Sequence, residues 1–156
     1  DGGVRVPYMV YWKNHIPAQV YDRPVLSLDA GATALALAGV KTRPGEIDGV
    51  NLVPYLTGKK DGEPHDALYW RFRGQSAIRE GKWKFYYLQE GARMLFDMES
   101  DEHENKNLIE QYPEIAKRLE KKLATFRAEQ KRPGFAMDST PEEDAFYKHY
   151  FNVNGQ

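Results

Sequence analysis

The chain has 156 residues, enough for one domain with a hydrophobic core or for a small domain plus part of another. A formal net charge of −1 excludes a general electrostatic attraction to nucleic acid or anionic membranes. The absence of cysteine excludes a disulfide framework, a thiolate zinc site and a cysteine nucleophile within these residues.

Residues 4–12 form a nearly unbroken apolar run at the very start of the sequence. Apolar side chains on both faces are typical of a strand that is covered on both sides in an α/β sheet, so we predict a strand here. We interpret this start as the interior of a domain that begins earlier. Such a strand, separated from its sheet, leaves unpaired backbone groups and uncovered surface. We therefore expect the chain to self-associate through two segments, residues 4–12 and the helix that we predict at 26–38.

The predicted helix at 26–38 is rich in Ala and Leu. Ser27 or Asp29 can cap its start, and Gly39 stands where a left-handed C-terminal residue is favoured. Because the helix is apolar nearly all round, we expect it to be buried. Gly31 weakens a helix by roughly 1 kcal/mol relative to Ala, which predicts close packing against a neighbour at that position.

A loop is predicted at 41–49, a short helical turn at 51–58 and a polar connector at 59–66, in which we place the main domain boundary. The longest apolar stretch, 25–40, falls short of the ~20 residues that a membrane-spanning helix needs. We therefore expect no membrane-embedded segment.

After the connector the pattern predicts an antiparallel meander, with turns at Glu80-Gly81 and Glu90-Gly91. The predicted strands are residues 68–72, 75–79, 83–88 and 93–97. Pro113 then opens an amphipathic helix, whose apolar stripe we expect to pack on one face of the meander. That stripe consists of Ile115, Leu119, Leu123 and Phe126. Residues 132–156 are predicted to form an irregular arm with an aromatic cluster.

The acidic segment that starts at Asp97 invites comparison with a calcium-binding EF-hand loop. Such a loop needs glycine at its sixth position and glutamate at its twelfth, where this chain has Glu102 and Leu108. We therefore predict a solvated turn. No histidine has a second potential ligand at metal-ligand spacing. We therefore expect all four histidines to lie at the surface, namely His15, His65, His103 and His149.

Arg71, Arg73 and Gln75 alternate in the sequence, which would place all three on one face of a single strand. Two guanidinium groups there could grip a planar or tetrahedral anion. The alternative is a solvated face paired with nearby carboxylates.

The order of the motifs resembles the C-terminal third of the formylglycine-dependent sulfatases of the alkaline phosphatase-like superfamily. The motifs that carry this resemblance are G-G-V-R-V-P, S-L-D-A-G-A-T-A-L-A-L-A-G-V, I-D-G-V-N-L-V-P-Y-L-T-G, A-L-Y-W-R-F-R-G and L-F-D-M-E-S-D-E-H-E-N-K-N-L. They cover about residues 2–130 and are most similar to arylsulfatase-like and N-acetylgalactosamine-6-sulfatase-like members. The chain departs from the family at Ala30–Ala32, where bulky residues and Pro are more usual.

The resemblance implies an α+β architecture in which residues 1–60 are the end of the catalytic α/β domain, a strand plus a buried helix. Residues 61–131 would form a small subdomain of four antiparallel strands packed on one long helix, and residues 132–156 an irregular aromatic tail. In this family the small subdomain borders the substrate cleft, so Arg71, Arg73 and His65 become candidate substrate contacts.

The family nucleophile lies in a C/S-x-P-x-R motif and is oxidised to formylglycine, while a calcium ion polarises the sulfate oxygens. Both come from an earlier part of the polypeptide, so we expect no catalytic residue, metal ligand or cofactor in this chain. Ser139-Thr140-Pro141 mimics the motif, but Glu143 replaces its Arg. Calcium and formylglycine are implied for the full-length parent only, whose family is commonly periplasmic or exported.

Two functional interpretations remain open. In the first, the chain is a fragment of a sulfate ester hydrolase, inactive alone, that needs the missing N-terminal sulfatase portion as its partner. The parent would act on a sulfated glycan or small molecule. In the second, it is a stand-alone binding or interaction module without catalysis.

Overall fold

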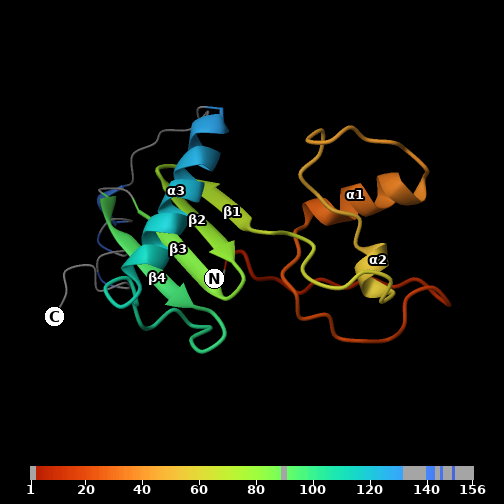
Figure 1. Ribbon diagram of the computed structural model, residues 1–156, viewed down its shortest axis with the longest axis horizontal. Coiled ribbons are helices and arrows are strands. Elements are labelled where there is room, and N and C mark those ends of the chain that lie inside the picture. Colours follow the sequence, from red (N-terminus) through yellow and green to blue (C-terminus); the bar gives the residue numbers. More distant parts are fainter. Residues whose placement is uncertain (1–2, 89–90, 132–139, 143–144, 146–148, 150–156) are drawn as a thin grey trace. The chain divides into compact units, whose positions relative to one another are not determined.

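The computed structural model of the chain describes residues 3–88, 91–131, 140–142, 145 and 149, so most of the predicted arm at 132–156 lies outside the described residues. The elements are α1 (Leu28–Leu37), α2 (Val53–Leu56), β1 (Leu68–Phe72), β2 (Gln75–Glu80), β3 (Trp83–Tyr87), β4 (Arg93–Asp97) and α3 (Pro113–Glu129) (Figure 1). The chain divides into two compact units between Leu68 and Tyr69, which we call the N-terminal unit and the sheet unit.

The sheet unit is built on four strands in the order β1-β2-β3-β4, which is the predicted meander. The strands begin and end within one residue of the predicted bounds. In the register of the central strands, Ile78 lies opposite Phe85, and Phe85 lies opposite Leu95. All three side chains are fully buried, so this row forms the centre of the core. Gly81 has a φ of 54° in the β2–β3 turn, a conformation that glycine adopts without steric cost.

Helix α3 packs across one face of the sheet against β2 and β3, as its apolar stripe predicts (Figure 1). Leu119 and Leu123 are almost completely buried, and Pro113 occupies the first turn. The ring of Phe126 stacks on Tyr69 with 4.6 Å between ring centroids. The four-stranded antiparallel sheet with one long C-terminal helix is therefore confirmed.

The second face of the sheet also has buried side chains. Met94 and Phe96 point away from the Leu95 row and join Leu88 and Met98 in a cluster against which Tyr86 packs. Both faces of the sheet therefore carry buried apolar side chains. Strand β4 is buried at four of its five positions.

Helix α1 of the N-terminal unit ends as predicted at Gly39, which has a φ of 72°. The backbone N–H of Gly39 donates to Ala36, and that of Val40 donates to Leu35. These two bonds form a Schellman motif, which satisfies carbonyl groups of the last helical turn. Ser27 occupies the N-cap position, but its side chain makes no capping hydrogen bond.

The predicted strand at 4–12 is wrong. The described residues of this segment contain no regular secondary structure, and Met9 and Tyr11 are 92% and 86% exposed. A strand exists only through hydrogen bonds to a neighbouring strand, and no described strand pairs with this segment. The apolar pattern is that of a strand, but the hydrogen-bonding partners that a strand needs are not among the described residues.

The predicted complete burial of α1 is also wrong. Only Asp29 and Ala32 are buried, whereas Leu28 and Leu37 are more than half exposed. Gly31 faces open space instead of a close neighbour. The close approach occurs at Gly49, where an added Cβ would overlap the carbonyl group of Leu28 and lie 3.1 Å from the Cβ of Ala32.

Candidate functional site

The two candidate arginines lie at the end of β1. Arg71 is in the strand, and its Nη1 donates to the carbonyl of Lys131 over 3.2 Å. Arg73 lies past the end of the strand, with a φ of 52° and its guanidinium carbon 5.4 Å from the centroid of the Phe72 ring. Because β1 ends at Phe72 and Gln75 opens β2, the expected alternation of Arg71, Arg73 and Gln75 along one strand is wrong.

The third candidate, His65, belongs to a buried polar cluster in the N-terminal unit. Its Nε2 lies 2.9 Å and 3.0 Å from the two carboxylate oxygens of Asp29, a residue with no exposed surface. The same carboxylate accepts the backbone N–H groups of Leu26 and Val50, over 2.7 Å and 2.8 Å. Asp29 therefore connects three chain segments that are far apart in sequence.

The other histidines agree with the expectation of surface positions where the structure describes them. His15 is exposed and stacks on Trp12 with 4.0 Å between ring centroids, and His103 and His149 are exposed. For His65 the expectation is wrong, because only 9% of its side chain is accessible.

A second buried polar cluster lies in the sheet unit around Lys84 on β3. Its Nζ lies 2.8 Å from Oε1 of Glu104, and the side chains are 1% and 4% exposed. The rings of Tyr86 and Trp70 lie 4.8 Å and 5.5 Å from the ammonium group. The hydroxyl of Tyr86 donates to Glu104 over 2.8 Å. The charge of Lys84 is thus compensated by a carboxylate and by aromatic faces.

Burial alone would raise the pKa of Glu104, but opposing interactions, of which the hydrogen bond from Lys84 is the largest, outweigh it and lower that pKa below its ordinary value. For Lys84 the balance differs, because burial lowers the pKa of the ammonium group and Glu104 offsets this only in part. A carboxylate stabilised in this way is ionised at neutral pH.

The acidic segment after β4 is an ordered loop, so the predicted solvated turn is wrong at Glu104. The carboxylate of Asp101 accepts the backbone N–H groups of Asn105 and Lys106, and these bonds lower the pKa of Asp101. Asn107 accepts the backbone N–H of Leu95 over 3.0 Å and ties the loop to β4.

The described side chains do not provide the group of ligands that a calcium site, implied by the resemblance for the parent only, would need. Among the described residues, no three His, Cys, Asp or Glu side chains form a group that could hold a metal ion. In the same residues, no helix combines the length and apolar character needed to cross a membrane.

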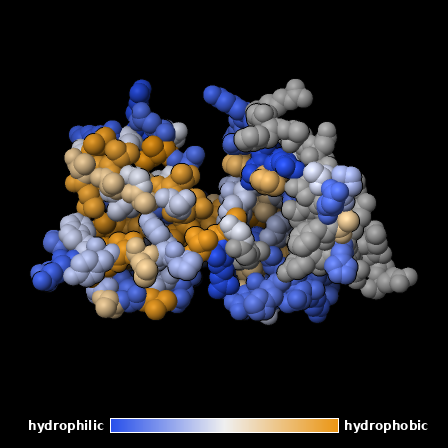
Figure 2. Space-filling model, turned by 180° about the vertical axis from the view of Figure 1, so that it is seen from behind, coloured by the Kyte–Doolittle hydropathy of each residue, from blue (hydrophilic) through white to orange (hydrophobic). Residues whose placement is uncertain are grey.

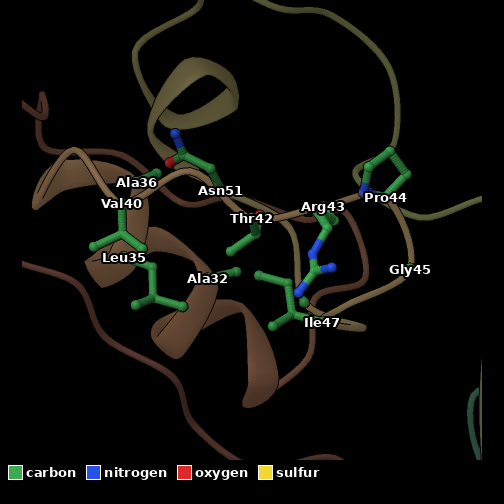
Figure 3. Close-up of a pocket in the computed structure, with 11 residues that line it drawn as sticks. Ala32, Leu35, Ala36, Val40, Thr42, Arg43, Pro44, Gly45, Ile47 and Asn51 are labelled. Atoms are coloured by element: carbon green, nitrogen blue, oxygen red, sulfur yellow. The ribbon is translucent and has the colours of Figure 1, made fainter.

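The N-terminal unit also contains an open groove of about 350 Å³ between α1 and the loop that follows it (Figure 3). Its apolar wall is formed by Ala32, Leu35, Ala36, Val40 and Ile47. Polar groups come from Thr42, Arg43 and Asn51. The guanidinium of Arg43 lies 3.7 Å from Glu46, and its side chain is 89% exposed.

Both buried clusters and the groove escape sequence reasoning because each depends on residues that are distant in the chain. Each buried cluster leaves one local signal in the sequence. Asp29 is a charged residue within an apolar helix, and Lys84 is a lysine between aromatic residues of a strand. A charge placed within an apolar element predicts a buried partner, but it does not say which one.

Comparison with solved structures identifies proteins that share this fold. The structure described as "Crystal structure of Ps i-CgsB" matches with a TM-score of 0.69 at 22% identity, over 92% of this chain and 34% of that chain. The phosphonate monoester hydrolase of Agrobacterium radiobacter matches with a TM-score of 0.54 at 22% identity, over 69% of this chain and 26% of the other. At such identities the likeness establishes the fold alone, and the fold is that of a segment of larger proteins.

Sequence comparison then identifies the family. The family described as "N-sulphoglucosamine sulphohydrolase, C-terminal" matches residues 1–129, so the chain belongs to this family of sulfatase C-terminal domains. It is 30% identical to arylsulfatase A of Bos taurus over 143 residues, covering 74% of this chain and 28% of the relative. It is 37% identical to choline-sulfatase of Rhizobium meliloti (strain 1021) over 116 residues, covering 70% and 22%. The resemblance inferred from the motifs is confirmed, and the chain spans about a quarter of these relatives.

Proposed function

We propose that the chain is the C-terminal part of a hydrolase of sulfate esters, and that the nucleophile is supplied by polypeptide outside these residues. The observation that carries this proposal is the family match over residues 1–129. Relatives with 30% and 37% identity are named arylsulfatase A and choline-sulfatase, and this chain corresponds to 28% and 22% of their lengths. The remaining length is enough to contain a complete catalytic domain.

Formylglycine and calcium belong, in this proposal, to the outside portion. The chain has no cysteine, and its Ser139-Thr140-Pro141 has Glu143 in place of the motif's Arg, so neither residue type supplies the nucleophile motif. Its described residues contain no group of side chains suited to a metal ion. The role left to the chain is to complete the fold and to contribute contacts to the substrate.

Arg71 and Arg73 are the residues that we assign to substrate contact. Each guanidinium presents a planar fork of N–H donors, which suits the charged oxygens of a sulfate group or the carboxylate of a sulfated sugar. Arg73 has a φ of 52°, a conformation that costs a non-glycine residue energy and that often occurs at functional sites. These features support binding of an anionic substrate.

His65 is a weaker candidate for direct contact because its Nε2 is held by Asp29. A substrate contact would have to use Nδ1 of a ring that is 9% exposed. We assign His65 chiefly to holding the connector at 59–66 against α1 through its contact with Asp29. Substitution of His65 would test whether its Nδ1 also contacts the substrate.

The test compares two polypeptides, the 156-residue chain and the product of the complete reading frame that contains it. Both are produced together with a formylglycine-generating enzyme and assayed with calcium on 4-methylumbelliferyl sulfate. We expect hydrolysis only by the longer product. Hydrolysis by the chain alone would contradict an external nucleophile, and an inactive longer product that still binds sulfated glycans would favour a non-catalytic binding module.

A further inference from the structure

The sheet unit differs from the N-terminal unit in the character of its surface. In Figure 2 the described surface of the sheet unit is mainly hydrophilic, whereas the visible face of the N-terminal unit is mainly hydrophobic. A site on the sheet unit is therefore suited to a charged or polar ligand. Guanidinium groups on such a surface can recognise oxyanions, provided that no carboxylate of the chain already occupies them.

Two arginines of the sheet unit meet this condition. Arg93 and Arg118 each pair with a carboxylate of the chain. Arg71 and Arg127, in contrast, have no carboxylate partner among the residues that the structure describes. Glu129 is only two positions from Arg127, but side chains at this spacing do not face each other on a helix. The positive charges of Arg71 and Arg127 are therefore available to a ligand.

Both arginines lie at the C-terminal end of α3. Arg127 belongs to the last turn of the helix. Arg71 on β1 donates from Nη1 to the carbonyl of Lys131, just beyond the helix, over 3.2 Å. Tyr69, which shares a strand face with Arg71, stacks on Phe126, the residue before Arg127. The strand and the helix thus bring the two guanidinium groups to one end of the sheet unit.

Each guanidinium group is held by the chain and keeps donors for a ligand. The guanidinium carbon of Arg127 lies 4.3 Å from the centroid of the Tyr87 ring. A guanidinium over an aromatic face keeps its in-plane N–H groups available for hydrogen bonds. Arg71 uses Nη1 for the carbonyl of Lys131, which leaves its other N–H groups available. The side chain of Lys131 is itself exposed and adds a positive charge at the same end.

We infer that Arg71 and Arg127 together bind one sulfate group, with each guanidinium donating to its oxygens. Planar forks of N–H donors match the oxygens of a tetrahedral oxyanion, and sulfate is the oxyanion of the proposed reaction. The inference rests on the proposed function, which assigns Arg71 to substrate contact, and it adds Arg127 to that site. The sulfate group has two sources, an ester on a saccharide or the free ion that hydrolysis releases.

The experiment follows the arginine Nε–H resonances of the 156-residue chain by two-dimensional NMR in dilute solution. D-galactose 6-sulfate and sodium sulfate are titrated separately, with D-galactose and sodium chloride at matched ionic strength as ligand controls. The titrations are repeated with Arg71→Gln, Arg127→Gln and the charge-preserving Arg127→Lys. Arg118→Gln is the matched control, because it removes the same group from an arginine of α3 that already pairs with Glu80. Backbone amide resonances of the same samples report whether each variant keeps its fold.

We expect the resonances of Arg71 and Arg127 to shift with both sulfate-containing probes and to saturate with one dissociation constant. Arg71→Gln and Arg127→Gln should each weaken binding at the remaining arginine roughly tenfold, because a charge-assisted hydrogen bond is lost. Arg127→Lys should weaken it less, since the charge remains while the fork is lost. Arg118→Gln should leave it unchanged. Tighter binding of D-galactose 6-sulfate than of sodium sulfate would assign the site to a saccharide ester, and the reverse order would assign it to the free ion.

Shifts that sodium chloride reproduces at the same ionic strength would overturn the inference, because they would reflect screening alone. A response of Arg127 that Arg71→Gln leaves unchanged would also overturn it, because the two arginines would then not share a ligand. Activity separates the two proposals. Hydrolysis of 4-methylumbelliferyl sulfate by the product of the complete reading frame, without saturable shifts at the two arginines, refutes only the sulfate site. Saturable shifts without hydrolysis refute only the sulfatase assignment.

Discussion

Lys84 on β3 and Glu104 in the loop after β4 form an ion pair of 2.8 Å in the sheet unit, with almost no exposure of either side chain. Removing one member of such a pair leaves the other charge buried without compensation, which is far more costly than the pair itself is stabilising. The pair therefore makes the position of the loop on the sheet depend on both residues together.

We predict that Glu104→Leu lowers the free energy of unfolding by about 3 kcal/mol, because the ammonium group of Lys84 then remains buried alone. Adding Lys84→Met should recover at least about 1 kcal/mol, since no uncompensated charge is left. Urea denaturation followed by fluorescence of the tryptophans measures both. A double variant less stable than Glu104→Leu would contradict the proposal that the uncompensated charge of Lys84 destabilises the single variant.

The same pair predicts a dependence on pH. The pKa of Glu104 in the folded protein is lowered from its ordinary value of 4.5, so the folded state binds fewer protons than the unfolded state as the carboxyl titrates. Its contribution to stability is complete above pH 4.5 and is lost as the pH falls through the folded-state pKa. Glu104→Gln should therefore flatten the loss of stability below pH 4.5. The exposed Glu110 supplies the control, and Glu110→Gln should keep the wild-type slope.

How far the sequence predicts this fold depends on whether the signal is local. The strands at 68–72 and 93–97 are predicted correctly because a hydrophobic pattern and turn residues lie within each segment. The segment 4–12 carries an equally clear apolar pattern, but a strand also needs a partner, and sequence composition does not report partners. Periodicity therefore locates the elements and fails where the structure depends on something distant.

The candidate site shows the same difference between features with a local sequence signal and features that depend on distant residues. The arginines are found because their side-chain chemistry is visible in the sequence, but the end of β1 at Phe72 separates Arg71 from Arg73 in a way that alternation does not predict. Asp29 and His65 are 36 positions apart and meet only after the N-terminal unit has folded. Such a pair has no spacing signature, because its distance is fixed by tertiary packing.

Two glycines provide a contrasting test of packing. A methyl group at Gly49 would lie 2.6 Å from the carbonyl carbon of Leu28, so Gly49→Ala must shift the backbone and should cost about 1–3 kcal/mol. Gly31 lies within α1 where an added methyl group would meet open space, so Gly31→Ala should stabilise the helix by about 0.5–1 kcal/mol. Hydrogen exchange of α1 amides measures both. Equal effects of the two substitutions would show that the close approach at Gly49 is absent in solution.

Arg71 and Arg73 are predicted to affect substrate binding in the product of the complete reading frame. Alanine at either position should raise KM for a sulfated substrate by roughly tenfold, the loss expected for a charge-assisted hydrogen bond of about 1.5 kcal/mol, with a smaller change in kcat. Arg118→Ala is the control, because that arginine pairs with Glu80 on the sheet and is not a candidate contact. Unchanged KM in both variants would remove these arginines from the site.

The final prediction concerns the chain as a separate molecule. Because residues 4–12 and α1 leave apolar side chains exposed, as at Met9 and Leu37, we expect the purified chain to self-associate through these two segments. The apparent mass from multi-angle light scattering should rise with protein concentration, and Met9→Lys combined with Leu37→Lys should lower it toward the monomer. Phe72→Lys, which alters a side chain that is 60% exposed in the sheet unit, should leave the association intact. A wild-type chain that stays monomeric at every concentration would show that these surfaces do not bind each other.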